Sequence, residues 1–209
     1  MLKRKSVISP DVSYTFADYF KLNAETEEVL AYFGYSFAPQ KLALPRAEAP
    51  AERLAELRTR LEEGLPLLGL TSETARREFL IAPVLWEAVR LTQAKIRVEY
   101  AIEVDQQLKG AFDYFLQGRG AFLVVEAKNA DLTRGFTQLA VELIALDKLQ
   151  EEPCEMLYGA VSIGEIWQFG QLQRQQRAIQ QDLNLYRVPG DLTEVLNILI
   201  GTLNQRPGA

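Results

Sequence analysis

Glu126 and Lys128 stand at the end of an apolar stretch, where charged side chains can do chemistry. The stretch FLVVEAKN, residues 122–129, runs from four apolar residues directly into Glu126, Ala127 and Lys128. Side chains alternate along a β-strand, so Glu126 and Lys128 point to the same side. A carboxylate can help to hold a metal ion, and an ammonium beside it supplies a further positive charge. The same pattern also occurs where a core strand simply ends and the chain returns to water.

Asp113 on the preceding strand provides a second carboxylate. A glycine-bearing turn, QGRG, lies between the two strands and is typical of a β-hairpin. If Gln117 pairs with Phe122 across this turn, Asp113 lies opposite Glu126, with Cβ atoms about 4.5–5.5 Å apart. Two carboxylates this close repel each other unless a positive charge lies between them. We therefore expect a divalent metal there, with Lys128 beside it, and a shift of one residue in the pairing would remove the arrangement.

The composition narrows the kind of metal and of catalysis. The chain has 209 residues, no histidine and one cysteine, Cys154. This excludes Ser-His and Cys-His nucleophilic pairs, zinc sites built on histidine or several cysteines, and an intrachain disulfide. No GxxxxGK[ST] or GxGxxG stretch is present, so the usual nucleotide-binding loops are missing. A metal must therefore sit on oxygen ligands, which favours Mg²⁺, Mn²⁺ or Ca²⁺.

Charge and hydropathy indicate the class of protein. Hydrophobic residues make up 48% of the chain and charged residues 24%, as is typical of a soluble globular protein. The formal net charge of −5 argues mildly against a nucleic-acid binder that relies on an overall positive field. After Lys3, Arg4 and Lys5 no apolar signal region follows, and no apolar run is long enough to span a bilayer. We expect a cytoplasmic protein without a membrane segment.

The elements that must position these residues suggest an α/β protein with a helical N-terminal extension. Residues 1–48 form the predicted extension and linker, in which Thr15 and Asp18 have the spacing of a capping box. Dense aromatic residues in this arm are expected to pack it onto the main body. The proline-containing segment 38–50 is expected to be a linker to the second domain, residues 49–209.

The second domain is predicted to contain strands between helices. Within TSETARREFLIAPVLWEAVRL, Pro83 should break or kink a helix. IRVEYAIEV alternates strictly, which places its five apolar residues, from Ile96 to Val104, on one face of a strand. The remaining predicted elements are helices over 51–63, 131–150 and 191–203, strands over 110–116 and 121–128, and strands in MLYGAVSI, EIWQFGQLQ and LNLYRV.

The spacing of Asp113 from Glu126-Ala127-Lys128 resembles the PD-(D/E)XK nuclease superfamily, and more narrowly the nuclease domains of type I restriction enzymes. The resemblance covers about residues 70 to 188: LKGAFDYFL is similar to their GxxDY strand, LVVEAKN to their VVEAK strand, and YGAVSIGEIWQF to the hairpin that closes their core. Phe112 stands where the signature carries proline. The resemblance implies a restriction-endonuclease-like core, a mixed central sheet flanked by helices.

The resemblance also implies roles for the matching residues. Asp113 and Glu126 would hold Mg²⁺ or Mn²⁺, with the carbonyl of Ala127 as a third ligand. Lys128 would orient and help to deprotonate the attacking water. The metal would lower the pKa of that water and offset the charge that builds on the phosphate.

Two helices are expected to contribute further groups. ETARREFLIAPVL resembles the helix before the core sheet in those nucleases, which makes Glu73 an outer metal ligand. Gln138 matches a glutamine that the group often carries and would contact a phosphate or Lys128. Glu142 lies one turn further on the same helical face. Four arginines are either phosphate contacts or surface charges: Arg76, Arg77, Arg119 and Arg134.

Three classes of function stay open at this stage. The first is a Mg-dependent nuclease that hydrolyses phosphodiester bonds of DNA, for which the analogy with related nucleases suggests a homodimer. The second is a catalytically inactive core of the same fold that binds nucleic acid or protein. The third is an interaction protein that acts through its aromatic N-terminal arm. Metal binding at Asp113 and Glu126 separates the first two, and deletion of residues 1–45 tests the third.

Overall fold

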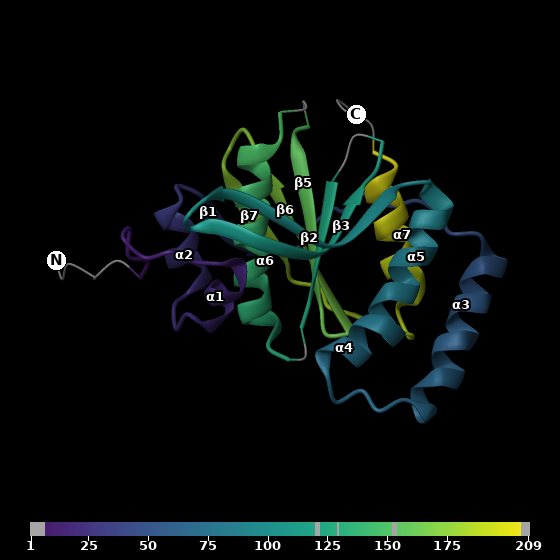
Figure 1. The fold of residues 1–209 in the computed structure, drawn as a ribbon. Helices are drawn as coiled ribbons and strands as arrows, with labels where there is room; N and C mark the ends of the chain where they lie inside the picture. Colours follow the sequence, from purple (N-terminus) through teal and green to yellow (C-terminus); the bar gives the residue numbers. More distant parts are fainter. Residues whose placement is uncertain (1–6, 120–121, 129, 152–153, 206–209) are drawn as a thin grey trace.

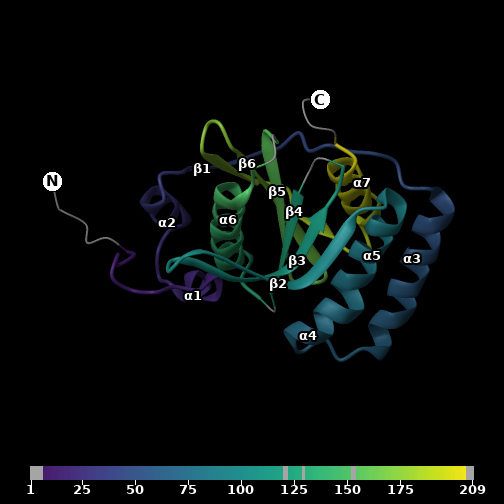
Figure 2. The ribbon, with the colours of Figure 1, turned by 45° about the horizontal axis from the view of Figure 1, so that its top comes forward.

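A computed structural model describes residues 7–119, 122–128, 130–151 and 154–205. It is an α/β fold in which a mixed sheet of eight strands has helices on both faces (Figures 1 and 2). The helices are α1 (Phe16–Lys21), α2 (Thr26–Tyr32), α3 (Ala51–Gly64), α4 (Glu73–Arg76), α5 (Ala82–Thr92), α6 (Leu132–Leu149) and α7 (Leu192–Leu203), with a short 3₁₀ turn at Leu65–Leu67. The strands are β1 (Ser36–Gln40), β2 (Lys95–Asp105), β3 (Leu108–Gln117), β4 (Phe122–Ala127), β5 (Met156–Ser162), β6 (Ile166–Gln173), β7 (Ala178–Asp182) and β8 (Tyr186–Arg187).

The order of the strands fixes where β4 ends. The sheet runs β1-β7-β6-β5-β4-β3-β2, and β8 pairs with β6. β3 and β4 are antiparallel, whereas β4 and β5 are parallel and are joined through α6. Parallel neighbours need a crossover connection, which α6 provides. The end of β4 and the first turns of α6 therefore lie close together, at the position of Glu126 and Lys128.

Both faces of the central strands are buried. One hydrophobic core lies between the sheet and α3, α5 and α7, and contains Leu123 and Val125 of β4. The other lies between the sheet and α1, α2 and α6, and contains Val124 of β4. Figure 2 shows these two groups of helices on opposite sides of the sheet. A strand buried on both faces reads as a continuous apolar run, which accounts for FLVV, and Glu126 follows Val124 onto the α6 side.

The N-terminal arm packs onto the body, as its aromatic residues predict. Its α1 begins with the predicted capping box, in which the backbone N–H of Thr15 donates to Asp18 Oδ2 over 2.9 Å. Phe16 and Tyr19 are each only 1% exposed and belong to the core beside α6. The arm is thus joined to the body by burial of its aromatic side chains.

The segment predicted as a linker, 38–50, is instead part of the folded body. It begins inside β1, which pairs in parallel with β7. Leu42 and Leu44 are buried in the core beside α7. The linker prediction is therefore wrong for this segment, because its leucines cover apolar surface. The domain boundary predicted at residue 48 follows β1. This strand belongs to the same sheet as β2–β8.

The prediction that IRVEYAIEV presents one apolar face is wrong. Ile96 packs against the first core, Tyr100 and Ile102 pack against the second, and Val98 is 55% exposed. Strict alternation needs extended backbone at every residue, but Glu99 has a φ of 51°. The strand therefore turns its apolar side chains from one core to the other at Glu99.

The neighbouring strand changes sides at the same level. Val98 pairs with Tyr114 and Tyr100 with Phe112, so Glu99 and Asp113 lie between these two pairs. Phe112 belongs to the second core and Tyr114 to the first. Asp113 thus sits at the point where β2 and β3 cross from one core to the other.

The helix with Pro83 is interrupted as predicted, although the irregularity precedes the proline. Residues Arg77–Ile81 form a π-helical turn between α4 and α5, and Pro83 falls in the first turn of α5. A π turn inside a helix widens it locally and is common at functional sites. The predicted helices 51–63, 131–150 and 191–203 correspond to α3, α6 and α7, while the strand in LNLYRV shortens to β8.

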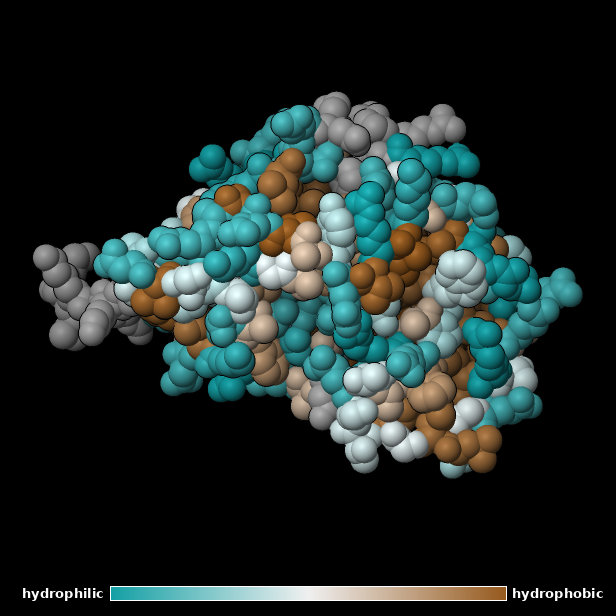
Figure 3. All heavy atoms as spheres, viewed as in Figure 1, coloured by the Kyte–Doolittle hydropathy of each residue, from teal (hydrophilic) through white to brown (hydrophobic). Residues whose placement is uncertain are grey.

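On the face drawn in Figure 3, polar surface interrupts the apolar areas, one of which lies at the connection between α3 and α4 that holds the 85% exposed Leu67. Among the described residues, every helix is too short or too polar to cross a membrane.

Candidate functional site

The β3–β4 hairpin has the predicted register. Gln117 pairs with Phe122, and the ladder continues to the pair Tyr114–Val125. The next step along both strands brings Asp113 to the level of Glu126. The backbone N–H of Ala127 donates to Asp113 Oδ2 over 2.8 Å. The side chain of Asp113 is therefore held against the end of β4, as the turn predicts.

Arg77 is the cationic partner of Asp113. Its Nη1 lies 3.4 Å from Asp113 Oδ1 and 3.4 Å from Glu99 Oε1. The guanidinium also lies 5.4 Å from the centre of the Tyr114 ring. The sequence left Arg77 as either a phosphate contact or a surface charge. Its side chain is only 18% exposed, so Arg77 is not a surface charge. Its position four residues after Glu73, on the same helical face, is the signal that could have placed it here.

Glu126 is a buried carboxylate, and only one of its two oxygens accepts hydrogen bonds within the described part of the chain. It is 1% exposed, and its Oε1 accepts hydrogen bonds from Lys128 Nζ and, over 2.7 Å, from Gln138 Nε2. Its Oε2 has no hydrogen-bond partner among the described residues. A buried carboxylate oxygen without a donor is costly unless it holds a proton or a cation. Gln138 thus contacts Glu126, whereas the resemblance implied a contact with a phosphate or with Lys128.

Glu142 lies behind Glu126, on the same face of α6 as Gln138. It is fully buried, and its Oε1 accepts a hydrogen bond of 2.9 Å from Gln138 Nε2. Burial raises the pKa of Glu142 well above its usual value, and the nearby Glu126 carboxylate raises it further. Its Oε2, like that of Glu126, has no donor among the described residues. Two buried acids this close favour a state in which a proton is shared between them.

The ionisation of Glu126 is shifted in the same direction. Burial raises the pKa of Glu126 to about 8, and the Asp113 carboxylate raises it further, while the charge and the hydrogen bond of Lys128 oppose the shift. Because the pKa of Glu142 is raised as well, the two acids together favour holding at least one proton near pH 7. A divalent cation would favour the carboxylate and so compete with that proton.

Lys128 is held as an ammonium. Burial alone would lower the pKa of Lys128, but Glu126, Asp113 and Glu73 together raise it above its usual value. Its Nζ also lies 5.2 Å from the centre of the Phe20 ring. In this state Lys128 is a hydrogen-bond donor and a positive charge, so it suits orientation of water and stabilisation of an anion more than abstraction of a proton.

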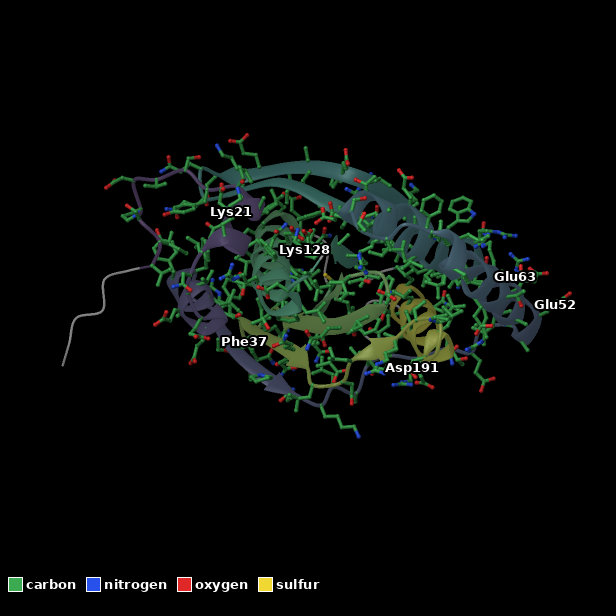
Figure 4. All side chains as sticks on the ribbon, turned by 90° about the horizontal axis from the view of Figure 1, so that it is seen from below. Lys21, Phe37, Glu52, Glu63, Lys128 and Asp191 are labelled. Carbon is green, nitrogen blue, oxygen red and sulfur yellow. The ribbon has the colours of Figure 1, made fainter. Side chains whose placement is uncertain are left out.

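A cavity of about 410 Å³ lies beside these groups. It is lined by Ala17, Phe20 and Lys21 of α1, by Glu73, Lys128 and Gln138, and by Ala130 and Asp131. Figure 4 shows Lys21 and Lys128 in the same region, away from Phe37, Glu52 and Asp191. Glu73 is therefore brought to the same cavity as Lys128 and Gln138, whereas the contribution of α1 is not foreseen from sequence.

The carboxylates at the end of β4 would suit a magnesium ion better than a calcium ion. In the described ranges, no three His, Cys, Asp or Glu side chains form a group that could hold a metal ion, so Glu73 does not complete such a group with Asp113 and Glu126. Calcium takes six to eight oxygen ligands, whereas magnesium commonly uses one or two carboxylates and keeps several waters. Asp113 and Glu126 supply two carboxylates at the end of β4, which is the number that the second case requires.

Comparisons with known proteins do not add a family to this geometry. No protein-family model, no curated protein and no solved structure matches the chain. The site is therefore interpreted from its own residues and their contacts.

Proposed function

We propose that this chain is a metal-dependent nuclease with a restriction-endonuclease-like core that hydrolyses phosphodiester bonds of DNA. The observation that carries the proposal is the convergence of Asp113, Glu126 and Lys128 at one strand end. The hairpin register and the contact between Ala127 N–H and Asp113 support this convergence. The parallel β4–α6–β5 unit beside the antiparallel β3 is consistent with the core that the sequence resemblance implies.

Different residues of the chain would have different roles in such a reaction. Asp113, Glu126 and the Ala127 carbonyl would hold Mg²⁺, which when bound supplies an activated water and offsets charge on the phosphate. Gln138 fixes the orientation of Glu126 through its Nε2. Lys128, as an ammonium, donates to the attacking water or to a phosphate oxygen. The buried setting strengthens each of these electrostatic interactions.

A second candidate function is an inactive domain of the same fold that binds nucleic acid or protein. One specific observation favours it: both candidate ligands already have cationic partners. Asp113 lies beside Arg77, and Glu126 accepts from Lys128. Such internal pairing can hold the acids in place without a metal ion.

Metal binding separates the two candidates. Mg²⁺ and Mn²⁺ are titrated calorimetrically into the wild type, into Asp113→Asn and into Asp131→Asn. Asp131 lines the same cavity and caps α6, and asparagine keeps that capping role. Cleavage of single- and double-stranded DNA is followed in parallel.

The nuclease predicts metal binding and cleavage that are both lost in Asp113→Asn and both kept in Asp131→Asn. If the wild type is folded but binds neither metal, the nuclease proposal is contradicted. The second candidate, an inactive binding domain, then remains. Metal binding without cleavage of either DNA form contradicts the proposed reaction while keeping the metal site.

A further inference from the structure

The wall of the cavity opposite the catalytic strand end comes from the N-terminal arm. Ala17, Phe20 and Lys21 of α1 line the same cavity as Lys128 and Gln138. The arm is therefore part of the site, although it lies outside the segment that resembles a nuclease.

This wall is held firmly in place. Tyr19 Oη donates to the carbonyl of Gln107 over 2.7 Å, and the Phe16 ring stacks on Phe112 with centroids 5.6 Å apart. Phe16 approaches β3 so closely that a Cβ on Gly110 would lie 2.8 Å from its Cδ2. Each of these contacts anchors α1 to the β2–β3 ribbon, so Phe20 is presented from a fixed position.

Phe20 differs from the other aromatic residues of α1. Phe16 and Tyr19 are 1% exposed and serve the core, whereas Phe20 is half-buried and lines the cavity. Lys128 Nζ lies 5.2 Å from its ring centre. An aromatic ring beside the groups that would act on a phosphate is placed to contact the base of the nucleotide that carries that phosphate.

We propose that this cavity binds an unpaired base of single-stranded DNA, with Phe20 as its stacking platform. The inference rests on the proposed nuclease function for its class of substrate. In a duplex, each base is stacked on its neighbours and presents only its edges in the grooves. An unpaired base has a free face, and stacking of that face on an aromatic side chain tolerates any sequence.

The size of the cavity and the net charge of the chain support a single strand over a duplex. A cavity of about 410 Å³ is in the range of small-molecule pockets and suits one nucleotide at a time. Affinity for duplex DNA comes largely from neutralised phosphates, yet the chain has a net charge of −5. Stacking of bases would therefore supply binding energy that the overall charge of the chain does not supply.

The test measures binding of a labelled oligothymidine and of a blunt duplex of equal length by fluorescence anisotropy. The full chain is used, with Ca²⁺ in place of Mg²⁺, and gels verify that each probe stays intact. The variants are Phe20→Ala, Phe20→Trp, and Tyr32→Ala as a control from the same arm, since Tyr32 does not line the cavity. Thermal unfolding verifies that each variant is folded.

The wild type is expected to bind the single strand more tightly than the duplex. Phe20→Ala should lower single-strand affinity about tenfold, which is the scale of one lost stacking contact. Phe20→Trp should keep the affinity, and its added indole fluorescence should be quenched by the bound strand. Tyr32→Ala should behave as the wild type.

Two results would overturn the inference: duplex binding as tight as single-strand binding, or single-strand affinity in folded Phe20→Ala equal to that of the wild type. Failure of the proposed nuclease is recognised separately, by the absence of metal binding at Asp113 and of cleavage. Phe20-dependent binding of the single strand without cleavage would retain the stacking site and remove the nuclease. Cleavage together with single-strand binding that does not depend on Phe20 would retain the nuclease and remove the stacking site.

Discussion

Gln138 Nε2 donates a hydrogen bond of 2.7 Å to Glu126 Oε1 and so links helix α6 to the end of strand β4. The same amide nitrogen donates to Glu142 Oε1 over 2.9 Å. One neutral side chain therefore holds two buried acids, and under the proposed function these acids would exchange a proton for a cation.

Replacement of Gln138 by methionine is expected to destabilise the metal-free protein. The two carboxyl groups would each lose a donor in a buried setting, which costs about 1–3 kcal/mol for a polar group left without a partner. The free energy of unfolding is measured in urea. Gln171→Met is the matched control, because Gln171 bonds the neutral side chain of Gln180 and its loss leaves no buried acid without a donor. Equal losses in both variants would argue against a special role for Gln138.

Glu126 makes stability depend on pH in a direction opposite to that of a carboxylate whose pKa is lowered by a salt bridge. Its pKa is about 8 in the folded protein, against an ordinary value of 4.5. Between these values the folded state binds more protons than the unfolded state, so stability falls as pH rises. Glu126→Gln, which cannot ionise, should show a smaller fall in Tm across this range without metal. An unchanged slope would show that Glu126 does not titrate as proposed.

Metal binding should release a proton at this site. The carboxylate of Glu126 is the form that holds a cation, and the metal-free pocket favours the protonated form below about pH 8. The affinity for Mg²⁺ is therefore expected to rise with pH up to this value. Calorimetry in buffers of different ionisation enthalpy measures the proton released. Binding that shows neither proton release nor pH dependence would place the metal away from Glu126.

Removal of the Arg77 charge is expected to strengthen metal binding. The guanidinium lies 3.4 Å from Asp113 Oδ1 and competes with a cation for that carboxylate. Arg77→Met keeps an unbranched apolar stem and should raise the Mg²⁺ affinity on the order of tenfold, while it lowers stability without metal. Arg134→Met, at a half-exposed arginine paired with Asp131, is the control and should change neither quantity appreciably. A loss of metal affinity in Arg77→Met would mean that Arg77 positions Asp113 for the metal.

Local patterns predicted most of the elements and part of the site. The apolar run 122–125 and the turn before it predicted a buried strand in a hairpin, and both the strand and its register are present. The helix that places Gln138 and Glu142 followed from its Asp131 cap and its apolar stripe. These succeed because strand alternation, helix periodicity and tight turns relate residues that are close in sequence.

The exceptions come from backbone and packing that sequence patterns do not encode. Ile96 to Val104 alternates as one face would, yet the positive φ of Glu99 moves the strand from one core to the other. The leucines of 38–50 lie among prolines, which suggested a linker, yet they cover the core beside α7. In both cases burial against distant elements outweighs the local signal.

The sequence by itself determined that Glu126 and Lys128 share one side of a strand, that a hairpin brings Asp113 to Glu126, and that any metal must sit on oxygen ligands. These follow from side-chain alternation, a short turn and the absence of histidine, all of which are properties of composition or of neighbouring residues. Only the tertiary structure decided that Arg77 binds Asp113 and that Phe20 lies over Lys128. Those contacts join segments far apart in the chain, and they arise from how α1 and the π turn pack against the sheet.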